Sequence, residues 1–209
     1  QIFFPLQDRD WLVLVAGAPL GVQYGLAHYL EALGYRFNHP FATLSPAALP
    51  AEPAGTLLGQ AFAPETARRG LHLHTLHPIE GLWDFWVPSP EHLDGARQTL
   101  NWVVRNRGNY LQWCALDDII KSAATAEAWR AHTASIIALA KTLGVKVWLA
   151  IQLFGKSNLQ NAFDLLDDPL PADPRAEMEQ RYTLLLGGLA IDTLNISFGE
   201  FFGADPAAF

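Results

Sequence analysis

The sequence predicts an α/β protein in which a small N-terminal α/β domain precedes the first half of a (β/α)₈ barrel. Apolar, strand-like runs alternate with helix-like periods along most of the chain. From residue 70 onward the strand starts recur at intervals of roughly 36 to 46 residues, which fits a decorated βα unit. Each of these strands is followed by polar residues. Alternating strands and helices are typical of a parallel sheet, and barrels carry their polar groups at the carboxyl ends of the strands.

The composition is that of a globular protein. Half of the 209 residues are hydrophobic, 17% are charged and the net charge is −7. This charge, without a cluster of Lys and Arg, argues against a nucleic-acid partner. No apolar run approaches the ~18 residues of a membrane span, so we expect no membrane partner. The single cysteine, Cys114, excludes an internal disulfide and a cysteine metal cluster, and we expect it in the core.

The N-terminal domain is predicted to span 1–67, of which 41–67 form a connector rich in Pro and Ala with only 56–62 strand-like. Gly34 is expected to end the one helix of this domain. The expected elements are a buried strand at 11–16, a helix at 21–33 that carries Val22 and Leu26 at helical spacing, and a short strand at 35–37.

Residues 68–209 are predicted to form the barrel half. The expected strands are 70–76, 110–116, 146–154 and 192–198, and the expected helices begin after Ser89, near Ala126 and after Asp173. A doubly wound sheet would need a Gly-rich turn after its first strand, where only Gly81 stands. A complete barrel needs about 250 residues. We therefore expect either further strands outside this sequence or a homo-oligomer that covers the open strand edges.

The segment 68–86 is predicted to contribute side chains to a functional site. Alternation at period 2 places Leu71 and Leu73 on one face of the strand and His72 and His74 on the other. A loop with dense polar and aromatic side chains follows the strand, as is common where a scaffold strand opens into a site. These side chains are His77, Glu80, Trp83, Asp84 and Trp86.

Two stretches resemble a known group of enzymes. GVQYGLAHYLEALGYRFNHP, residues 21–40, is similar to the "G-x-x-Y/F-G-x-x-x-L-L-E-x-L-G-x-R-F-x-x-P" segment of α-glucuronidases and β-hexosaminidases. There it ends an N-terminal α/β domain, and a Pro-rich connector and an "R-G-x-x-L/H" strand follow. Arg69–Gly70 stand where that second motif begins. The resemblance covers about the first 80 residues and implies a catalytic barrel after the connector.

The resemblance also implies a glycoside hydrolase, with an acid/base glutamate at the end of the fourth barrel strand. Glu200 stands at that position, and its carboxylate partner would be Asp117 or Asp118. Gly199 occupies the place of the Asp that precedes this glutamate in β-hexosaminidases, and His74 replaces a first-strand Asp. Substrate-assisted chemistry and the identity of the sugar are therefore left open.

The substrate is expected to be an oligo- or polysaccharide, which favours a periplasmic or extracellular location. No metal and no cofactor are expected. Polar side chains would bind sugar hydroxyls or a carboxylate, and exposed indoles would stack on a sugar ring. The predicted substrate contacts are Arg69, His74, His77, Glu80, Trp83, Trp86, Gln152 and Asn195.

Two other functions fit parts of the same sequence. His72 and His74 on a first barrel strand, with His77 as a third ligand, are the pattern of a metal-dependent amidohydrolase that activates water on zinc. The later ligands of that superfamily, including its fourth-strand lysine, have no match in this sequence. A degenerate barrel that binds carbohydrate without hydrolysing it is the second alternative. Asp117 and Asp118 could also have a structural role at the start of a helix, because they precede a run that can begin one.

Overall fold

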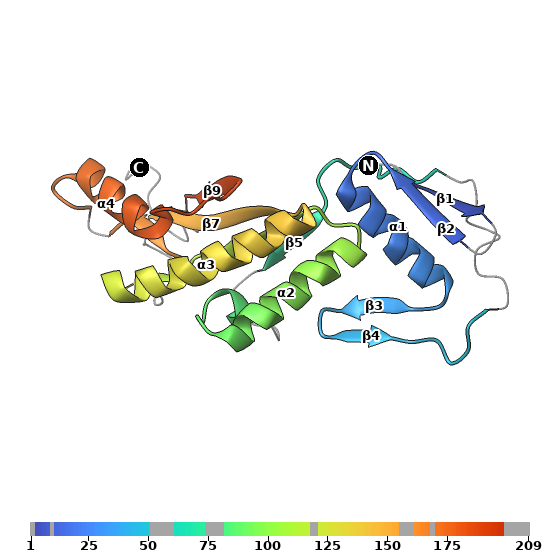
Figure 1. Ribbon diagram of the computed structural model, residues 1–209. Coiled ribbons are helices and arrows are strands. Elements are labelled where there is room, and N and C mark those ends of the chain that lie inside the picture. Colours follow the sequence, from blue (N-terminus) through green and yellow to red (C-terminus); the bar gives the residue numbers. More distant parts are fainter. Residues whose placement is uncertain are drawn as a thin grey trace, which may run out of the picture. The chain divides into compact units, whose positions relative to one another are not determined.

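The computed structural model contains a mixed α/β fold with a mostly parallel central sheet and, among the described residues, four α-helices (Figure 1). It describes residues 3–8, 11–50, 61–73, 82–117, 121–154, 161–167 and 170–198. The chain forms two compact units: unit 1 comprises 1–71, 97–111 and 139–146, and unit 2 comprises 72–96, 112–138 and 147–209. Unit 1 thus takes in the ends of two later helices in addition to the predicted N-terminal domain, 1–67.

Unit 1 opens with an antiparallel hairpin of β1 (Phe3–Asp8) and β2 (Trp11–Ala16), paired from Phe3↔Ala16 to Asp8↔Trp11. The strand β2 was predicted, but the prediction that it is buried is wrong, because Val13 and Val15 are exposed. An antiparallel sheet can leave one face to solvent, and a continuous apolar run does not reveal this. The preceding strand β1 was not predicted.

Helix α1 spans Pro19–Ala32, and Gly34 follows at φ +98°, as the predicted helix end requires. Its apolar Val22 and Leu26 point to solvent. The buried side of the helix instead combines two glycines with larger residues, and a search for large apolar residues misses such a stripe. The buried residues are Leu20, Gly21, Tyr24, Gly25 and Ala27.

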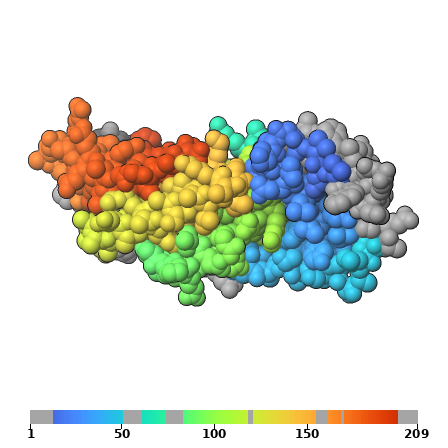
Figure 2. Space-filling model, viewed as in Figure 1, coloured from blue at the N-terminus to red at the C-terminus, as the bar shows by residue number. Residues whose placement is uncertain are grey.

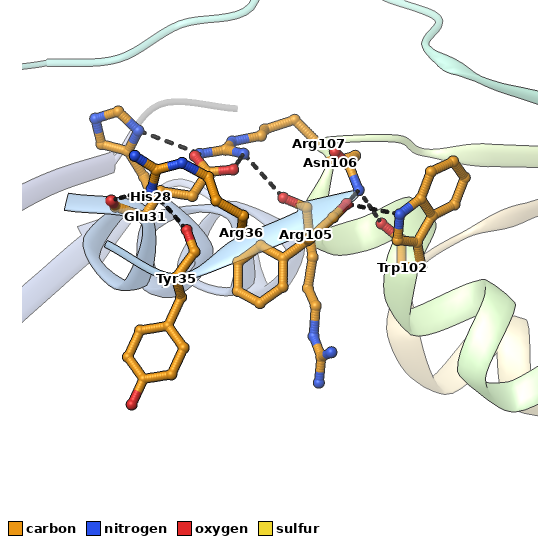
Figure 3. A network of polar contacts seen from close by, with 9 residues as sticks. His28, Glu31, Tyr35, Arg36, Trp102, Arg105, Asn106 and Arg107 are labelled. Carbon is orange, nitrogen blue, oxygen red and sulfur yellow. Dashed lines mark hydrogen bonds and ion pairs between the residues drawn. The ribbon is translucent and has the colours of Figure 1, made fainter. Parts of the chain in front are cut away.

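The strands β3 (Arg36–His39) and β4 (Ala42–Leu44) form a second antiparallel pair in unit 1. The first matches the short strand predicted at 35–37, whereas β4 falls in the predicted connector. The carbonyl oxygen of Phe37 accepts hydrogen bonds from the Trp102 indole at 2.7 Å and the Asn106 amide at 3.1 Å (Figure 3). These two bonds fix β3 to the end of a helix far along the sequence. Most of the strand expected at 56–62 lies outside the described residues.

The central sheet follows the predicted alternation of strands and helices. In this sheet β6 lies between β5 and β7, and β9 also pairs with β7. Figure 1 shows helices α2 and α3 running along these strands. The elements are β5 (Gly70–Leu73), α2 (Pro90–Arg105), β6 (Tyr110–Cys114), α3 (Ala123–Leu143), β7 (Lys146–Phe154), α4 (Pro174–Leu186) and β9 (Thr193–Ser197). All seven were predicted, with ends that differ by a few residues.

Two short elements of the second unit were not predicted. The strand β8 (Asp164–Leu166) pairs parallel with the end of β7 through Gln152↔Asp164 and Phe154↔Leu166. A 3₁₀ helix, η1, spans Leu82–Phe85. Three or four residues carry too little periodicity to be recognised in a sequence. Both elements nevertheless position candidate functional residues.

The core of unit 2 lies against one face of β7, whose Val147, Leu149 and Ile151 are buried. The rings of Phe85 and Trp113 pack 5.0 Å apart between centroids. Burial of each such side chain stabilises the fold by about 1.5–3 kcal/mol. No helix among the described residues has the length and apolar character needed to cross a membrane.

Helix ends in both units confirm the predicted caps. The Ser89 hydroxyl accepts a hydrogen bond from the His92 backbone N–H at 3.1 Å, and Asp173 accepts one from Ala176 N–H at 3.0 Å. Gly144 ends α3 at φ +78°. Ser/Asp at helix starts and Gly at helix ends are therefore reliable guides to these boundaries.

Candidate functional site

The carboxyl end of β6 carries Asp117, one of the predicted catalytic residues. Its backbone N–H donates to Asn161 O at 3.1 Å, and its side chain, which is half-buried, lines a cavity of about 460 Å³. The other lining residues come from the segment after β6, from the region of β8 and from α4. They are Lys121, Phe163, Ala176, Glu177, Gln180, Arg181 and Leu184. The cavity therefore offers hydrogen-bond donors, acceptors and charges of both signs.

Arg181 is the polar centre of this cavity. Its guanidinium bonds to the carboxylate of Asp164, to Asp167 at 2.6 Å and to Glu177 at 3.0 Å. Burial alone would lower the pKa of Arg181, but the neighbouring carboxylates outweigh it and raise that pKa. One guanidinium thus faces three carboxylates, and the group as a whole carries excess negative charge.

The excess negative charge is reduced when Asp164, whose side chain is 13% exposed, binds a proton. Burial raises the pKa of Asp164 to about 6; Arg181 opposes this shift, while the charges of Asp117, Asp167 and Glu177 add to it. Asp164 therefore exchanges a proton near neutral pH. A carboxyl with a raised pKa close to another carboxylate is the arrangement by which enzymes separate a proton donor from an ionised partner.

Two predicted sugar contacts lie on one face of the sheet. The parallel register pairs Ala150 with Asn195 and Gln152 with Ser197. Since alternate residues of a strand share a face, Gln152 and Asn195 project from the same side of neighbouring strands. Gln152 is buried and Asn195 is exposed. Neither residue lines the cavity beside Asp117.

The two predicted stacking tryptophans have different surroundings. Trp83, in η1, is 54% exposed, whereas Trp86 is 2% exposed and donates its indole N–H to Cys114 O at 2.6 Å. Their rings contact edge to face with centroids 5.8 Å apart. Trp86 thus packs in the interior, and Trp83 supplies the exposed indole.

The backbone on either side of Trp83 is held by contacts from helices α2 and α3. The Asp84 carboxylate bonds to His92 Nδ1 at 2.8 Å, and the Asp84 carbonyl oxygen lies 2.8 Å from His132 Nε2. The Trp129 indole donates to Phe85 O at 3.3 Å. A Cβ at Gly95 would overlap the Asp84 carboxylate, so this close packing requires glycine on α2. The segment that carries Trp83 is therefore held in a defined position.

Arg69 lies in unit 1, just before the amino-terminal end of β5. Its Nε–H donates to Arg107 O at 2.8 Å, another N–H bonds to Thr66 O, and a third reaches the Tyr24 hydroxyl at 3.4 Å. Through these uncharged partners Arg69 links the connector to the start of β5. Arg69 also lines a separate cavity of about 370 Å³. Its role as a sugar contact stays a prediction.

Five predicted site residues lie outside the described residues: Asp118, Glu200, His74, His77 and Glu80. His72 is described and is exposed on β5, opposite the buried Leu73, as the period-2 pattern predicted. Among the described residues, no three His, Cys, Asp or Glu side chains are grouped so that they could hold a metal ion.

Arg181 and Asp164 were not predicted from the sequence. A signal for Arg181 was present, because it stands four residues before Leu185, which is buried, and so shares its helix face. A charged residue on the inward face of a helix marks a buried ion pair. Asp164 gave no comparable signal, since its strand is only three residues long.

Comparisons with family models, with curated proteins and with solved structures find no match to this chain.

Proposed function

We propose that this chain forms the first half of a glycoside hydrolase barrel and acts on an oligo- or polysaccharide by carboxylate acid/base catalysis. The proposal rests chiefly on Asp117, a carboxylate at the carboxyl end of a parallel strand that lines a cavity of about 460 Å³. Active sites of (β/α)₈ barrels are built from residues at this end of the strands.

The order of the strands supports the barrel. β6 lies beside β5, β7 beside β6 and β9 beside β7, with one α-helix in each of these connections. A doubly wound sheet would reverse its strand order at a switch point, and a barrel does not. β9 has no second partner strand among the described residues. Its outer edge is the place where the next barrel strand would pair.

The surroundings of Asp117 suit a polyhydroxylated substrate. Lys121, Gln180 and Arg181 offer N–H donors to sugar oxygens, and Glu177 offers an acceptor. We assign Asp117 the role of nucleophile or base. Glu200, placed by the sequence after the fourth strand, is the proton donor in this proposal.

Asp164 is a carboxyl with a raised pKa beside the same site. Its carboxyl, with a pKa of about 6, lies behind Arg181 and does not line the cavity. We assign it a positioning role through Arg181, because a change in its charge alters the hold on the guanidinium that borders the cavity.

The test is hydrolysis of a panel of aryl glycosides and aryl uronides. We expect release of the aryl group by the wild-type chain, provided the remaining barrel strands are present. Asp117→Asn and Glu200→Gln should each lower kcat at least about 10²-fold while KM stays within a few-fold. Glu127→Gln, an exposed carboxylate on α3, is the matched control and should leave the rate unchanged. Undiminished rates in both site variants would refute the assignment.

Binding without hydrolysis is the second candidate, because Trp83 is exposed on a firmly held segment. An indole presented in this way can stack on a sugar ring without any catalytic group. Saturable binding that is lost in Trp83→Ala, together with no turnover on any glycoside, would select this function.

A further inference from the structure

Unit 1 contains a cavity of about 370 Å³ that the function proposed for Asp117 does not use. Of the nine described residues that line it, five are the consecutive residues 62–66, and the other four are Tyr24, His28, Arg69 and Arg107. The stretch 62–66 precedes β5, so much of the cavity wall consists of chain outside helices and strands.

The His28 side chain, on α1, contacts this wall and a second segment at the same time. Its ring centroid lies 4.4 Å from that of Phe62, with the two ring planes at 55°. Its Nδ1 lies 3.2 Å from a guanidinium nitrogen of Arg107, in the turn after α2, and Figure 3 shows the ring pointing toward that guanidinium. One imidazole thus joins α1 both to the stretch 62–66 and to the end of α2.

The bond to Arg107 requires that the His28 ring is neutral. A guanidinium carries N–H donors and no acceptor, so Nδ1 of His28 must accept and the ring proton is on Nε2. A ring that binds a second proton carries N–H groups on both nitrogens. Two donors and two positive charges would then face each other across the same 3.2 Å.

The carboxylate of Glu31 is the one group in this cluster that favours a proton on His28. It stands three residues further along α1, but both of its oxygens already accept hydrogen bonds from Arg107. Burial, most strongly, and the charge of Arg107 lower the pKa of His28 below its ordinary 6.5, and Glu31 opposes them. Burial and one cation therefore outweigh the carboxylate.

The other titratable or charged groups that line the cavity are Tyr24, Glu65 and Arg69. Burial raises the pKa of Tyr24 above its ordinary 10.0 although Arg69 opposes this, so the phenol stays neutral in mild acid. Its hydroxyl donates to Gly108 O at 2.8 Å. Glu65 is exposed.

We propose that His28 is a pH-sensitive contact, which holds the wall of this cavity in neutral solution and releases it in mild acid. When the ring binds a proton from solvent, the hydrogen bond from Arg107 is lost and the ring turns away from Phe62. The far end of the stretch stays attached, because the Ala67 carbonyl oxygen accepts from the Asn109 amide at 2.7 Å. This device is independent of the function proposed for Asp117.

The experiment is an NMR titration of the whole chain from pH 8 to pH 5, with ¹³C-labelled His and Phe and ¹⁵N-labelled Arg. At pH 8 we expect a nuclear Overhauser effect between the rings of His28 and Phe62, which lie 4.4 Å apart. It should disappear as His28 titrates, with a midpoint below 6.5. The Arg107 Nε–H should shift with the same midpoint. Asp164 in unit 2 titrates in this range as well, so only signals of these three residues count.

Three variants assign the transition. His28→Gln keeps an acceptor for Arg107 but binds no proton in this range, so the Phe62 ring signals should lose the transition. Arg107→Gln removes the cation that faces Nδ1 and should raise the midpoint of His28. His39→Gln is the matched control, because His39 is also in unit 1 and its ring also contacts a phenylalanine, Phe41, at 5.5 Å. It should leave the transition unchanged.

Several outcomes would overturn the proposal. They are a ring contact that persists after His28 is protonated, a midpoint at or above 6.5, no titration of His28 down to pH 5, and the same Phe62 transition in His28→Gln. Loss of helical circular dichroism with the same midpoint would also overturn it, because unfolding would then explain the lost contact. The titration contains no sugar, so a negative result leaves the hydrolysis assay unaffected.

Discussion

Asp164 illustrates how burial controls a single ionisable group in this protein. Arg181 pairs with its carboxylate, yet the loss of water and the neighbouring carboxylates raise the pKa of Asp164 to about 6. An ion pair is therefore not enough to keep a buried carboxyl ionised when one cation is shared among several anions.

The raised pKa predicts a specific dependence of stability on pH. The ordinary pKa of an Asp carboxyl is 3.8, so the folded state binds this proton more tightly than the unfolded state. The resulting stabilisation is complete below about pH 4 and is lost as pH rises through about 6.

We expect Asp164→Asn to remove this part of the pH dependence. Urea denaturation at pH 4 and pH 7 gives the free energy of unfolding of wild type and variant at each pH. The change in this free energy between the two pH values is then compared between the two proteins. Asp167→Asn, an exposed partner of the same arginine, should retain most of it. An unchanged pH dependence in Asp164→Asn would contradict the assigned pKa.

Cys114 provides a second test at the residue scale. It is buried on β6, as predicted, and burial raises the pKa of its thiol to about 11. Only the thiolate reacts readily with disulfide reagents, so the native chain should not react with Ellman's reagent at pH 8 within minutes. Unfolding in urea should release one equivalent of product. Full reaction of the native chain would show that β6 is accessible.

At the scale of elements, Gly95 shows a packing constraint that overrides helix propensity. Gly→Ala within an exposed helix normally stabilises by about 1 kcal/mol. Here we expect Gly95→Ala to destabilise by about 1–3 kcal/mol, because the new Cβ overlaps the Asp84 carboxylate.

A double-mutant cycle with Asp84→Ala isolates this overlap. The second substitution also removes the bond to His92, so the informative quantity is the coupling between the two changes. We expect Gly95→Ala to be neutral or stabilising in the Asp84→Ala background. Equal destabilisation in both backgrounds would exclude the overlap as the cause.

The elements that could be predicted are those whose signals are local. Helix α2 was predicted from Ser89, Pro90 and a regular apolar face, and β7 from a mostly apolar run of nine residues. The strands β4 and β8 have three residues each, and their pairing depends on distant partners. The exposed side of α1 was misjudged because burial there follows the glycines and not the largest apolar residues.

The candidate site was predictable only where it follows strand ends. Asp117 and Gln152 were named because they stand at or near the ends of apolar runs. The cavity beside Asp117 depends on α4 packing against β8, a contact between elements that the sequence does not connect. The exposure of Trp83 and the burial of Trp86 likewise depend on which indole reaches the carbonyl of Cys114.

At the scale of the whole molecule, the pairing of β9 has the clearest consequence, because β7 is its one partner strand among the described residues. Ile196 on β9 is 44% exposed, and Phe198, directly after the strand, is 67% exposed. The segment that contains β9 is red in Figure 2. Parallel strands in stable sheets are buried on both faces, and unpaired edges promote association. The 209-residue chain should therefore self-associate through β9.

Sedimentation velocity over a range of concentrations tests this expectation. Ile196→Lys should reduce association, because a charge on an edge strand opposes pairing with another chain. Leu44→Lys changes a residue of similar exposure in unit 1 and should have no effect. A chain that stays monomeric at all concentrations would argue against an open barrel edge.

The most direct test of the proposed function is to locate where sugar binds. We would titrate ¹⁵N-labelled chain with cellotetraose, xylotetraose and chitotetraose in separate experiments. We expect at least one of them to shift the amides of Asp117, Gln152 and Asn195 and the indole of Trp83 in a saturable way. If none binds, or if the shifts fall on other surfaces and leave these four residues unchanged, the carboxyl ends of the strands are not a carbohydrate site.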